Sequence, residues 1–412
     1  MSAPVVVVGA GQAACQFVAS LRQGGHQGPL VVLGQEASPP YQRPPLSKAF
    51  LRDGDASALL LRPLSFFDTA RCELRLDTRV QGIDVQAAEV LLADGERLPY
   101  AALVLGTGAR ARRLPGLAAD APRVHVLRSL AHAQALRAGL GGCRRLAVVG
   151  GGYVGLEVAA AARAQGIDVT VFEAALRVMQ RSVGEATSRR VQRVHEDQGV
   201  RLRLGVSLDG VRASEEGVWL ASGGQTEAFD ALVVGIGALP RIELAQAAGI
   251  ECARGIVVDE QGRTSASGVF AIGDCTESRD GARPRLESVQ GAIDQAKAAA
   301  AAIAGRAPPP PAVPWFWSDQ YTHRLQVAGL PQGHDAVVLR QGAGERAVAQ
   351  SVWYLRGDRV LCVEALDAAG DFMAGRALIR TGTPVNPAQL ADPLFPLQPA
   401  SASASALVAA PV

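Results

Sequence analysis

Two glycine-rich segments of this 412-residue chain have the residue types and spacing of a turn that binds phosphate groups. They read VVVVGAGQAA at residues 5–14 and LAVVGGGYVGLE at residues 146–157. Each follows a run of β-branched or small apolar residues, precedes a helix-like stretch, and has an acidic residue about one strand–helix–strand unit downstream. The residues of the two patterns are Gly9, Gly11 and Ala14 with Glu36, and Gly150, Gly152 and Gly155 with Glu173.

The spacing gives each residue of the pattern a separate task. The first glycine permits a tight strand-to-helix turn, the second lets backbone N–H groups approach a diphosphate, and the third small residue lets the helix pack against the strand. The helix N-terminus offers its positive end to the anion, and the downstream carboxylate accepts hydrogen bonds from a ribose diol. Glycine turns also occur for structural reasons alone, but two copies in full context predict two bound dinucleotides.

The elements that must position these patterns alternate between strands and helices. The first series runs from residue 5 to about 109 and ends in LGTGA, and the second runs from 146, through a strand at 168–173, to VVGIGA at 233–238. This duplication predicts an α/β fold with two Rossmann-like dinucleotide-binding domains. The segments GVFAIGDC at 268–275 and the helix-like 286–304 are expected to return to the first domain.

A third region follows the run APPPPAVP at 307–314, which can be neither helix nor central strand and so predicts a stiff connector. Alternating strands at 326–363 then predict a C-terminal α+β domain. The expected domains are 1–109 together with 233–313, then 110–232, and then 314–390. A flexible tail rich in Ala, Ser and Pro is expected at 391–412.

The composition favours a soluble globular enzyme of two or three domains. A net charge of +2 and 48% hydrophobic residues argue against disorder and against nucleic-acid binding. No apolar run approaches the about 18 residues of a membrane span, and the first residues enter a strand at once, which favours the cytoplasm and no membrane partner. The six cysteines are dispersed without a CxxC pair, so no metal site is expected.

Together these motifs resemble the FAD-dependent ferredoxin reductases of bacterial oxygenase systems, within the glutathione-reductase-like superfamily. The more specific matches are PYQRPPLSKAFL at 40–51 and PWFWSDQY at 314–321. The segments LGTGA, AIGDC and RLESVQGAIDQAKAAA extend the resemblance over nearly the whole chain. The resemblance implies FAD at the first glycine turn, NADH at the second, and a C-terminal interface domain.

The resemblance implies that Asp274 binds the ribityl and phosphate region of FAD, although a plain helix N-cap is the alternative. Gln35 could replace Glu36 as the ligand of the adenosine ribose, and Gly291 departs from the Asn expected in its block. The implied FAD-binding residues are Gly9, Gly11, Ala14, Glu36, Arg43, Pro44, Lys48, Thr107, Gly108, Asp274, Glu287, Ser288, Val289 and Trp317.

The implied catalytic residues are Lys48 and Glu157. The resemblance places Lys48 beside the reactive edge of the flavin, paired with Glu157, where the pair could orient the nicotinamide and stabilise negative charge on reduced flavin. Lys48 and Lys297 are the only lysines of the chain, which agrees with a need for a compact ammonium at Lys48. An exposed surface lysine is the alternative.

The choice between NADH and NADPH depends on Glu173, whose carboxylate can hold the 2′ and 3′ hydroxyls of NADH but would repel the 2′-phosphate of NADPH. Arg177 and Arg181 could contact the nucleotide or be solvated, and Gly235 and Gly237 are expected to border the nicotinamide pocket. The implied NADH-binding residues are Gly150, Gly152, Tyr153, Val154, Gly155, Glu157, Glu173, Arg181, Gly235, Ile236 and Gly237.

The implied reaction is hydride transfer from NADH to FAD, followed by single-electron transfer to a [2Fe–2S] ferredoxin or a rubredoxin. This carrier would dock near the C-terminal domain and the flavin edge, at Trp315, Trp317 and Asp319, and would feed a Rieske-type dioxygenase or a P450. The aromatic cluster could also be ordinary core packing. Alternatives are an enzyme similar to apoptosis-inducing factor with another acceptor, a dithiol reductase, and a nucleotide-sensing protein. Monomer and homodimer both stay open.

Overall fold

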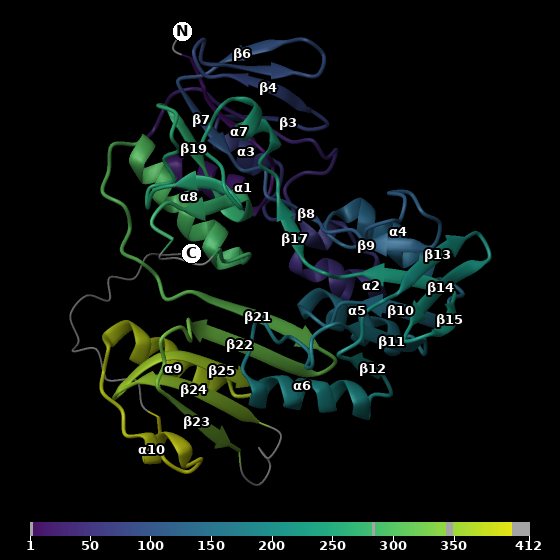
Figure 1. Ribbon diagram of the computed structural model, residues 1–412. Coiled ribbons are helices and arrows are strands. Elements are labelled where there is room, and N and C mark those ends of the chain that lie inside the picture. The colour runs from purple at the N-terminus through teal and green to yellow at the C-terminus, as the bar shows by residue number, and fades with distance from the viewer. Residues whose placement is uncertain (1–2, 282–284, 343–348, 398–412) are drawn as a thin grey trace. The chain divides into compact units, whose positions relative to one another are not determined.

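The computed structural model describes residues 3–281, 285–342 and 349–397, and the chain divides into two compact units (Figure 1). The first unit holds Met1–Cys143, Val211–Trp219 and Glu227–Pro311. The second holds Arg144–Gly210, Leu220–Thr226 and Ala312–Val412. Residues 398–412, most of the expected tail, lie outside the described residues, and the domain boundaries expected from the sequence stay a prediction.

A five-stranded parallel sheet forms the centre of the first unit. Its three inner strands, at residues 5–8, 30–33 and 102–105, are continuous apolar runs because both faces of the sheet are covered there. Chain order reverses beside β1, and such a point leaves a crevice outside the carboxyl ends of the strands. In spatial order the strands are β19 (Val269–Ala271), β7 (Ala102–Leu105), β1 (Val5–Val8), β2 (Leu30–Leu33) and β3 (Cys72–Arg75).

The two faces of this sheet belong to different hydrophobic clusters, as the period of two along a strand requires. Val5 and Val7 pack with α1 (Gln12–Gln23) and α8 (Val289–Ile303), which lie side by side (Figure 1). Val6 and Val8 pack with a second cluster on the other face. That cluster draws on β4 (Val80–Asp84), β5 (Glu89–Leu92), β6 (Arg97–Pro99), α7 (Glu243–Ala247) and β18 (Ile256–Val258).

Shorter elements complete the first unit. They are η1 (Pro44–Ser47), α2 (Ala49–Asp53), η2 (Ser57–Leu59), α3 (Ser65–Thr69), β8 (Ala109–Ala111) paired with β17 (Ala238–Pro240), β9 (Val124–Val126) paired with β16 (Ala231–Val234), α4 (Leu130–Leu140), η3 (Gly273–Cys275), and β20 (Thr276–Ser278) paired with β18. A small sheet of three strands, whose residues are divided between the two units, consists of β13 (Gly210–Ser214), β14 (Gly217–Ser222) and β15 (Gln225–Phe229).

The second unit begins with a parallel strand–helix–strand–helix–strand series. The strands β10 (Arg145–Val149), β11 (Asp168–Glu173) and β12 (Arg201–Leu204) pair in parallel. The connecting helices are α5 (Tyr153–Arg163) and α6 (Glu185–Asp197). Small residues on the buried face of α5, among them Ala159 and Ala162, let this helix lie close to the strands.

A five-stranded antiparallel sheet follows, with Trp353 at its fully buried centre. Gly375 of α9 (Ala369–Thr381) lets this helix approach the sheet, because an added Cβ would lie against Val363. α10 (Pro387–Ala391) is the last helix in the described part of the chain. In spatial order the strands are β21 (Trp315–Gln320), β22 (His323–Gly329), β25 (Arg359–Leu366), β24 (Gln350–Arg356) and β23 (Ala336–Gln341).

The other face of this sheet shares a core with α5 and α6. The buried carboxylate of Glu364 accepts the backbone N–H of Gly184 at 2.9 Å and so caps α6, whose N-cap glycine has no side chain to do this. Burial raises the pKa of Glu364. The expected fold class, two Rossmann-like regions and an α+β C-terminal domain, is confirmed.

Candidate functional site

The first glycine turn connects β1 to α1. Gly9 has φ +110°, and an added Cβ there would collide with the Gly106 carbonyl, so this position requires glycine for the fold. Gly11 precedes the helix in extended conformation, and an added Cβ there would meet nothing within 4 Å. Ala14 is buried in the core between helix and sheet. The open space beside Gly11 and the N–H groups of α1 fit a diphosphate.

Glu36 lies just beyond β2 and is fixed by two neighbours from the block 40–51. Tyr41 donates its O–H to one carboxylate oxygen at 2.6 Å, and Arg43 donates to the other at 2.8 Å. Burial alone would raise the pKa of Glu36, but the charge of Arg43 and these hydrogen bonds outweigh burial and lower it. The neighbouring Gln35 accepts from Arg241 instead, at 3.1 Å. Glu36 is therefore held as a carboxylate at the end of β2.

Asp274 does not act as a helix N-cap, because no side-chain cap bond is present at η3 and its carboxylate accepts from Arg128 at 2.6 Å. Arg128 also donates to the Ala109 carbonyl, so the arginine ties Asp274 to the segment after β7. Gly273 has φ +79°, and its N–H is held by the Gln295 amide oxygen at 2.6 Å. Asp274 is mostly buried, and its carboxylate lies at the carboxyl end of β19, on the edge of the sheet that also carries the glycine turn.

Thr107 and Gly108 follow β7 at the same edge of the sheet. The Thr107 hydroxyl donates to the Arg241 carbonyl at 2.7 Å, and the Gly108 carbonyl accepts the Arg241 N–H at 2.9 Å. Gly108 has φ +67°. Arg43, Arg128 and Arg241 contact this edge of the sheet, where Arg43 is paired with Glu36 and Arg128 with Asp274.

The block 40–51 forms a short 3-10 turn, because prolines at positions 44 and 45 favour its first residues. Lys48 follows that turn, with φ −125° and ψ −109°, and its ammonium donates to the Pro44 carbonyl at 3.2 Å.

The block before α8 is an N-terminal capping segment. Ser288 accepts the Gly291 N–H at 3.0 Å, Val289 begins the helix, and Glu287 pairs with Arg285 at 3.3 Å. An added Cβ at Gly291 would lie 3.1 Å from both the Leu286 carbonyl and the Ser288 hydroxyl. The glycine that departs from the expected Asn is therefore tightly enclosed.

The second glycine turn connects β10 to α5 and repeats the first. Gly150 has φ +108°, and an added Cβ at Gly155 would collide with the Gly150 carbonyl. Gly152 is extended, and an added Cβ there would meet nothing within 4 Å. The Glu173 carboxylate accepts the Gly151 N–H at 2.6 Å and the Ala175 N–H at 2.8 Å. Glu173 therefore holds the glycine turn itself, which the sequence pattern did not predict.

The remaining residues expected at NADH lie in different surroundings. Tyr153 packs its ring against Phe316 with centroids 5.0 Å apart, and burial raises its pKa. Val154 and Arg181 are exposed, whereas Arg177 donates to the carbonyls of Val183 and Gln180 and so braces a loop.

Gly235, Ile236 and Gly237 follow β16 in the first unit, while the second glycine turn belongs to the second unit. Gly237 has φ +102°, and its carbonyl accepts the Arg112 N–H at 2.9 Å.

Glu157 is a buried carboxylate on α5, only 6% exposed. Ser318 of β21 donates to it at 2.5 Å, and Gln320 donates to Ser318 at 3.1 Å. Trp317, from the same strand, stacks on Trp315 with centroids 5.5 Å apart. Sequence reasoning missed Ser318 and Gln320, although both lie inside the block 314–321 that it singled out.

Arg128 and Tyr41 were also missed. Tyr41 stands in the block 40–51, beside the residues that the motif did identify, and its hydroxyl accepts the Leu130 N–H at 2.9 Å. Arg128 has no local signal, because its contact with Asp274 joins positions 146 residues apart.

Within the described residues, all six cysteines are free and no group of three metal-ligating side chains occurs. The described helices include none that is long and apolar enough to cross a membrane. Cys15, near the first glycine turn, is buried, and burial raises its pKa to about 11 although Arg62 opposes this. Cys15 is therefore a protonated thiol at neutral pH.

Comparison with known families gives two matches. Residues 3–296 match the pyridine nucleotide-disulphide oxidoreductase family, and residues 315–401 match the reductase C-terminal family. The boundary between the two matches falls at the start of β21.

The chain is similar to rhodocoxin reductase of Rhodococcus erythropolis, with 42% identity over 96% of this chain and 93% of the relative. It is 41% identical to the ferredoxin–NAD(+) reductase component of the anthranilate 1,2-dioxygenase system of Burkholderia cepacia, over 96% of this chain and 98% of the relative. It is 40% identical to rubredoxin–NAD(+) reductase of Pseudomonas putida, over 88% of this chain and 95% of the relative.

Two solved structures are similar along nearly their whole length. The ferredoxin reductase of the CYP199A2 system from Rhodopseudomonas palustris has a TM-score of 0.91 and 40% identity, over 96% of this chain and 99% of that one. The reductase in the covalent putidaredoxin reductase–putidaredoxin complex has a TM-score of 0.90 and 36% identity, over 96% of this chain and 97% of that one.

Proposed function

The chain belongs to the pyridine nucleotide-disulphide oxidoreductase family, and we propose that it is an FAD-dependent NADH:ferredoxin reductase that serves an oxygenase. The observation that carries this proposal is the pair of glycine turns. In both turns, an added Cβ at the second glycine would meet no protein atom within 4 Å. An added Cβ at Gly9 or Gly155 would instead collide with a backbone carbonyl. The space is suited to the diphosphates of two dinucleotides.

FAD fits the first turn. Gly11 and the N-terminus of α1 would hold its diphosphate, and Glu36 would accept hydrogen bonds from the adenosine ribose. Asp274, fixed by Arg128 at 2.6 Å, would hold the ribityl and phosphate region. When bound, FAD supplies the ability to accept a hydride and to release electrons one at a time. The remaining residues proposed for FAD are Gly9, Ala14, Arg43, Pro44, Lys48, Thr107, Gly108, Glu287, Ser288, Val289 and Trp317.

NADH fits the second turn. Gly152 would admit its diphosphate, and the Glu173 carboxylate would favour a ribose with free hydroxyls over a 2′-phosphate. Glu173 already accepts two backbone N–H groups, so its orientation is set before the nucleotide arrives. This preorganisation lowers the entropic cost of binding. Lys48 and Glu157 are the charged groups that we assign to the reacting end of the nicotinamide.

The electron acceptor that we propose is a [2Fe–2S] ferredoxin. A solved relative is in complex with putidaredoxin, and the relatives named for the anthranilate 1,2-dioxygenase system and for the CYP199A2 system each match 96% of this chain. A dithiol substrate is disfavoured, because Cys15 is a buried thiol with a raised pKa and has no disulfide partner among the described residues. The cytoplasm, where NADH is available, is the proposed location.

The substitution Gly152→Trp tests the proposal. The indole would fill the space beside Gly152, so NADH should no longer bleach the flavin absorbance while FAD stays bound. The control is Gly210→Trp, at a glycine outside the turns where an added Cβ also meets nothing within 4 Å. NADH should bleach the flavin of this variant normally. Unchanged bleaching in Gly152→Trp would contradict the NADH assignment. A protein that purifies colourless and does not bind added FAD would contradict the flavin assignment.

A further inference from the structure

A continuous series of buried hydrogen bonds connects Glu157 to the end of α6. Ser318 contacts the Glu157 carboxylate at 2.5 Å, and Gln320 contacts Ser318 at 3.1 Å. The Gln320 amide oxygen lies 2.7 Å from Nε2 of His195, and Nδ1 of His195 lies 3.4 Å from the Tyr321 hydroxyl. We call Ser318, Gln320, His195 and Tyr321 the donor chain. All of its members belong to the second unit.

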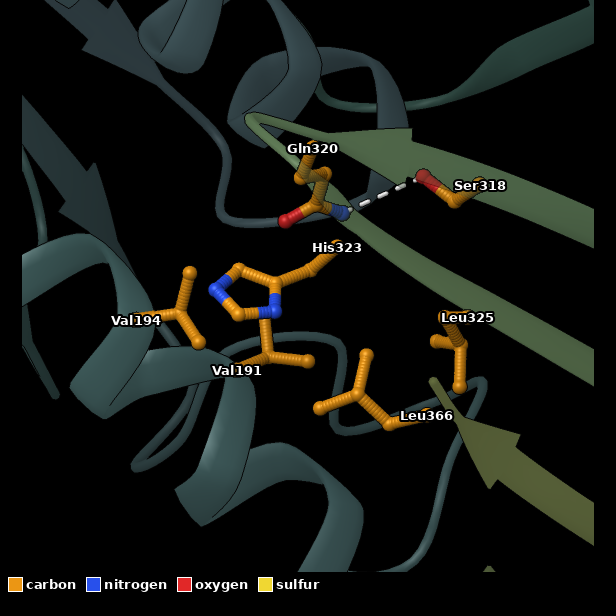
Figure 2. A pocket seen from close by; sticks show the side chains of 7 residues that line it. All are labelled: Val191, Val194, Ser318, Gln320, His323, Leu325 and Leu366. Carbon is orange, nitrogen blue, oxygen red and sulfur yellow. Dashed lines mark hydrogen bonds between the residues drawn. The ribbon is translucent and has the colours of Figure 1, made fainter. Parts of the chain in front are cut away.

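The carboxylate determines the direction of every bond in the donor chain. Because an ionised carboxylate only accepts, Ser318 must donate its O–H to Glu157. The Ser318 oxygen then accepts from the Gln320 amide nitrogen, as the dashed line in Figure 2 shows. The Gln320 amide oxygen is left to accept from His195, which must carry its proton on Nε2.

A neutral imidazole at His195 fits this arrangement. A neutral ring with Nε2–H donates to Gln320 and accepts at Nδ1 from Tyr321, which satisfies both of its nitrogens. Burial lowers the pKa of His195, and the nearby His323 lowers it further, although the hydrogen bond with Gln320 opposes both. His195 is fully buried. The ring is therefore neutral at neutral pH and can keep the tautomer that the donor chain needs.

The surroundings of the donor chain are apolar. A small cavity beside Ser318 is lined by Val191 and Val194 of α6 and by Leu325 and Leu366 of the C-terminal sheet (Figure 2). Ser318 is 1% exposed and Gln320 is 5% exposed. His323, which also borders the cavity, is paired with Asp367 at 2.6 Å. Hydrogen bonds among groups removed from water are stronger than exposed ones, and a lost partner costs more.

We propose that Ser318, Gln320 and His195 are positioning residues for the Glu157 carboxylate, which they hold in one orientation by a series of donors that all point toward it. This inference rests on the proposed role of Glu157 at the nicotinamide. The donor chain joins α6, β21 and α5, so the C-terminal domain takes part in arranging the reacting end of the NADH site.

The substitutions Ser318→Ala and Ser318→Thr test this inference in the FAD-loaded protein. Ser318→Ala removes the only donor of the series that contacts Glu157, and Ser318→Thr keeps a hydroxyl and suits a β-strand. The matched control is Ser351→Ala. Ser351 is also a fully buried strand serine that donates to a carboxylate, Asp371 at 2.6 Å, and accepts from Trp353 at 2.9 Å.

We expect Ser318→Ala to slow flavin bleaching at saturating NADH about tenfold, since a misplaced group costs far more in rate than in binding. The dissociation constant of NADH should change less than about twofold, because the glycine turn is intact. Ser318→Thr should recover most of the rate, and Ser351→Ala should bleach like the unsubstituted protein.

An infrared difference spectrum gives a readout that does not depend on activity. Loss of the Ser318 donor should shift a carboxylate stretching band in Ser318→Ala, and the shift should vanish in the Glu157→Gln background. The inference is overturned if Ser318→Ala bleaches like Ser351→Ala, or if no Glu157-dependent band shifts. Glu157→Gln separates the two proposals. Normal bleaching in Glu157→Gln would remove the role of Glu157, whereas slow bleaching in Glu157→Gln with normal bleaching in Ser318→Ala would remove the donor chain alone.

Discussion

The carboxylate of Glu173 at the end of β11 accepts the backbone N–H of Gly151 at 2.6 Å. Its other oxygen accepts the Ala175 N–H at 2.8 Å. An acidic residue that we propose to bind a ribose therefore also fixes the turn that we propose to bind the diphosphate. In this assignment, nucleotide choice and turn geometry are coupled through one side chain.

Glu173→Ala removes both hydrogen bonds and should loosen the glycine turn. Because a hydrogen bond to a charged group contributes about 1.5–3 kcal/mol, we expect the dissociation constant of NADH to rise roughly tenfold or more. Glu173→Gln keeps one acceptor oxygen, so its dissociation constant for NADH should lie between those of Glu173→Ala and the unsubstituted protein. Titration of NADH against flavin fluorescence measures this, with Glu185→Ala, at an exposed carboxylate on α6, as the control. Equal affinity in Glu173→Ala and Glu185→Ala would show that Glu173 has neither role.

The two glycines Gly152 and Gly155 should respond in opposite ways to substitution by alanine. At Gly155 the new Cβ collides with the Gly150 carbonyl, so the free energy of unfolding should fall by about 1–3 kcal/mol. At Gly152 the Cβ meets no protein atom within 4 Å, so stability should hold while NADH binding weakens. Urea unfolding and NADH titration of both variants check this pattern. A Gly152→Ala variant that binds NADH normally would argue against a diphosphate at this turn.

Asp274→Ala should release FAD. The substitution removes the carboxylate that we assign to the cofactor and leaves the largely buried Arg128 guanidinium without this partner. We expect FAD affinity to fall at least about tenfold, in line with the loss of a charge-assisted hydrogen bond. The FAD content after gel filtration measures it. Glu277→Ala is the control, because its partner Arg254 is 87% exposed and an exposed pair contributes little. Full FAD content in Asp274→Ala would refute the assignment.

His195 should make the protein less stable in acid. Burial lowers its pKa in the folded chain below the ordinary value of 6.5, so the unfolded chain takes up a proton first as the pH falls. The contribution of His195 to stability is therefore complete above about pH 6.5 and is lost as the pH falls toward the folded-state pKa.

The substitution His195→Gln removes this titration. Urea midpoints measured at about pH 7.5 and about pH 5.5 should therefore differ less in His195→Gln than in the unsubstituted protein. His334→Gln, at an exposed histidine of the same compact unit, should keep the full difference. A pH dependence that is the same in His195→Gln and in the unsubstituted protein would mean that folding does not lower the pKa of His195, and would contradict this prediction.

Both glycine turns were predictable from the sequence because their requirements are local. A positive φ at Gly9 and Gly150, and close packing at Gly155, constrain neighbouring residues in a fixed spacing. The strand at 168–173 is observed at the expected residues for the same reason, since its buried positions 169–172 are β-branched or aromatic residues.

The polar contacts inside the site were not predictable from spacing. Ser318 meets Glu157 across 161 positions, and Gln320 meets His195 across 125. Such pairs form only when separate elements pack, and a single sequence carries no local signal for them. The motif 314–321 identified the strand, but the alternation of side chains along it placed Ser318 and Gln320, rather than the tryptophans, against α5 and α6.

In the proposed reaction, electrons from NADH leave this protein one at a time through an iron–sulfur carrier. Anaerobic rapid mixing of the FAD-loaded protein tests it most directly, first with NADH and then with oxidised [2Fe–2S] ferredoxin or with rubredoxin. NADH should bleach the flavin absorbance, and ferredoxin should restore it rapidly. A flavin that NADH does not bleach, or one that only oxygen or a disulfide reoxidises, would contradict electron transfer from NADH to ferredoxin. If rubredoxin alone restores the flavin absorbance, rubredoxin takes the place of ferredoxin as the proposed partner.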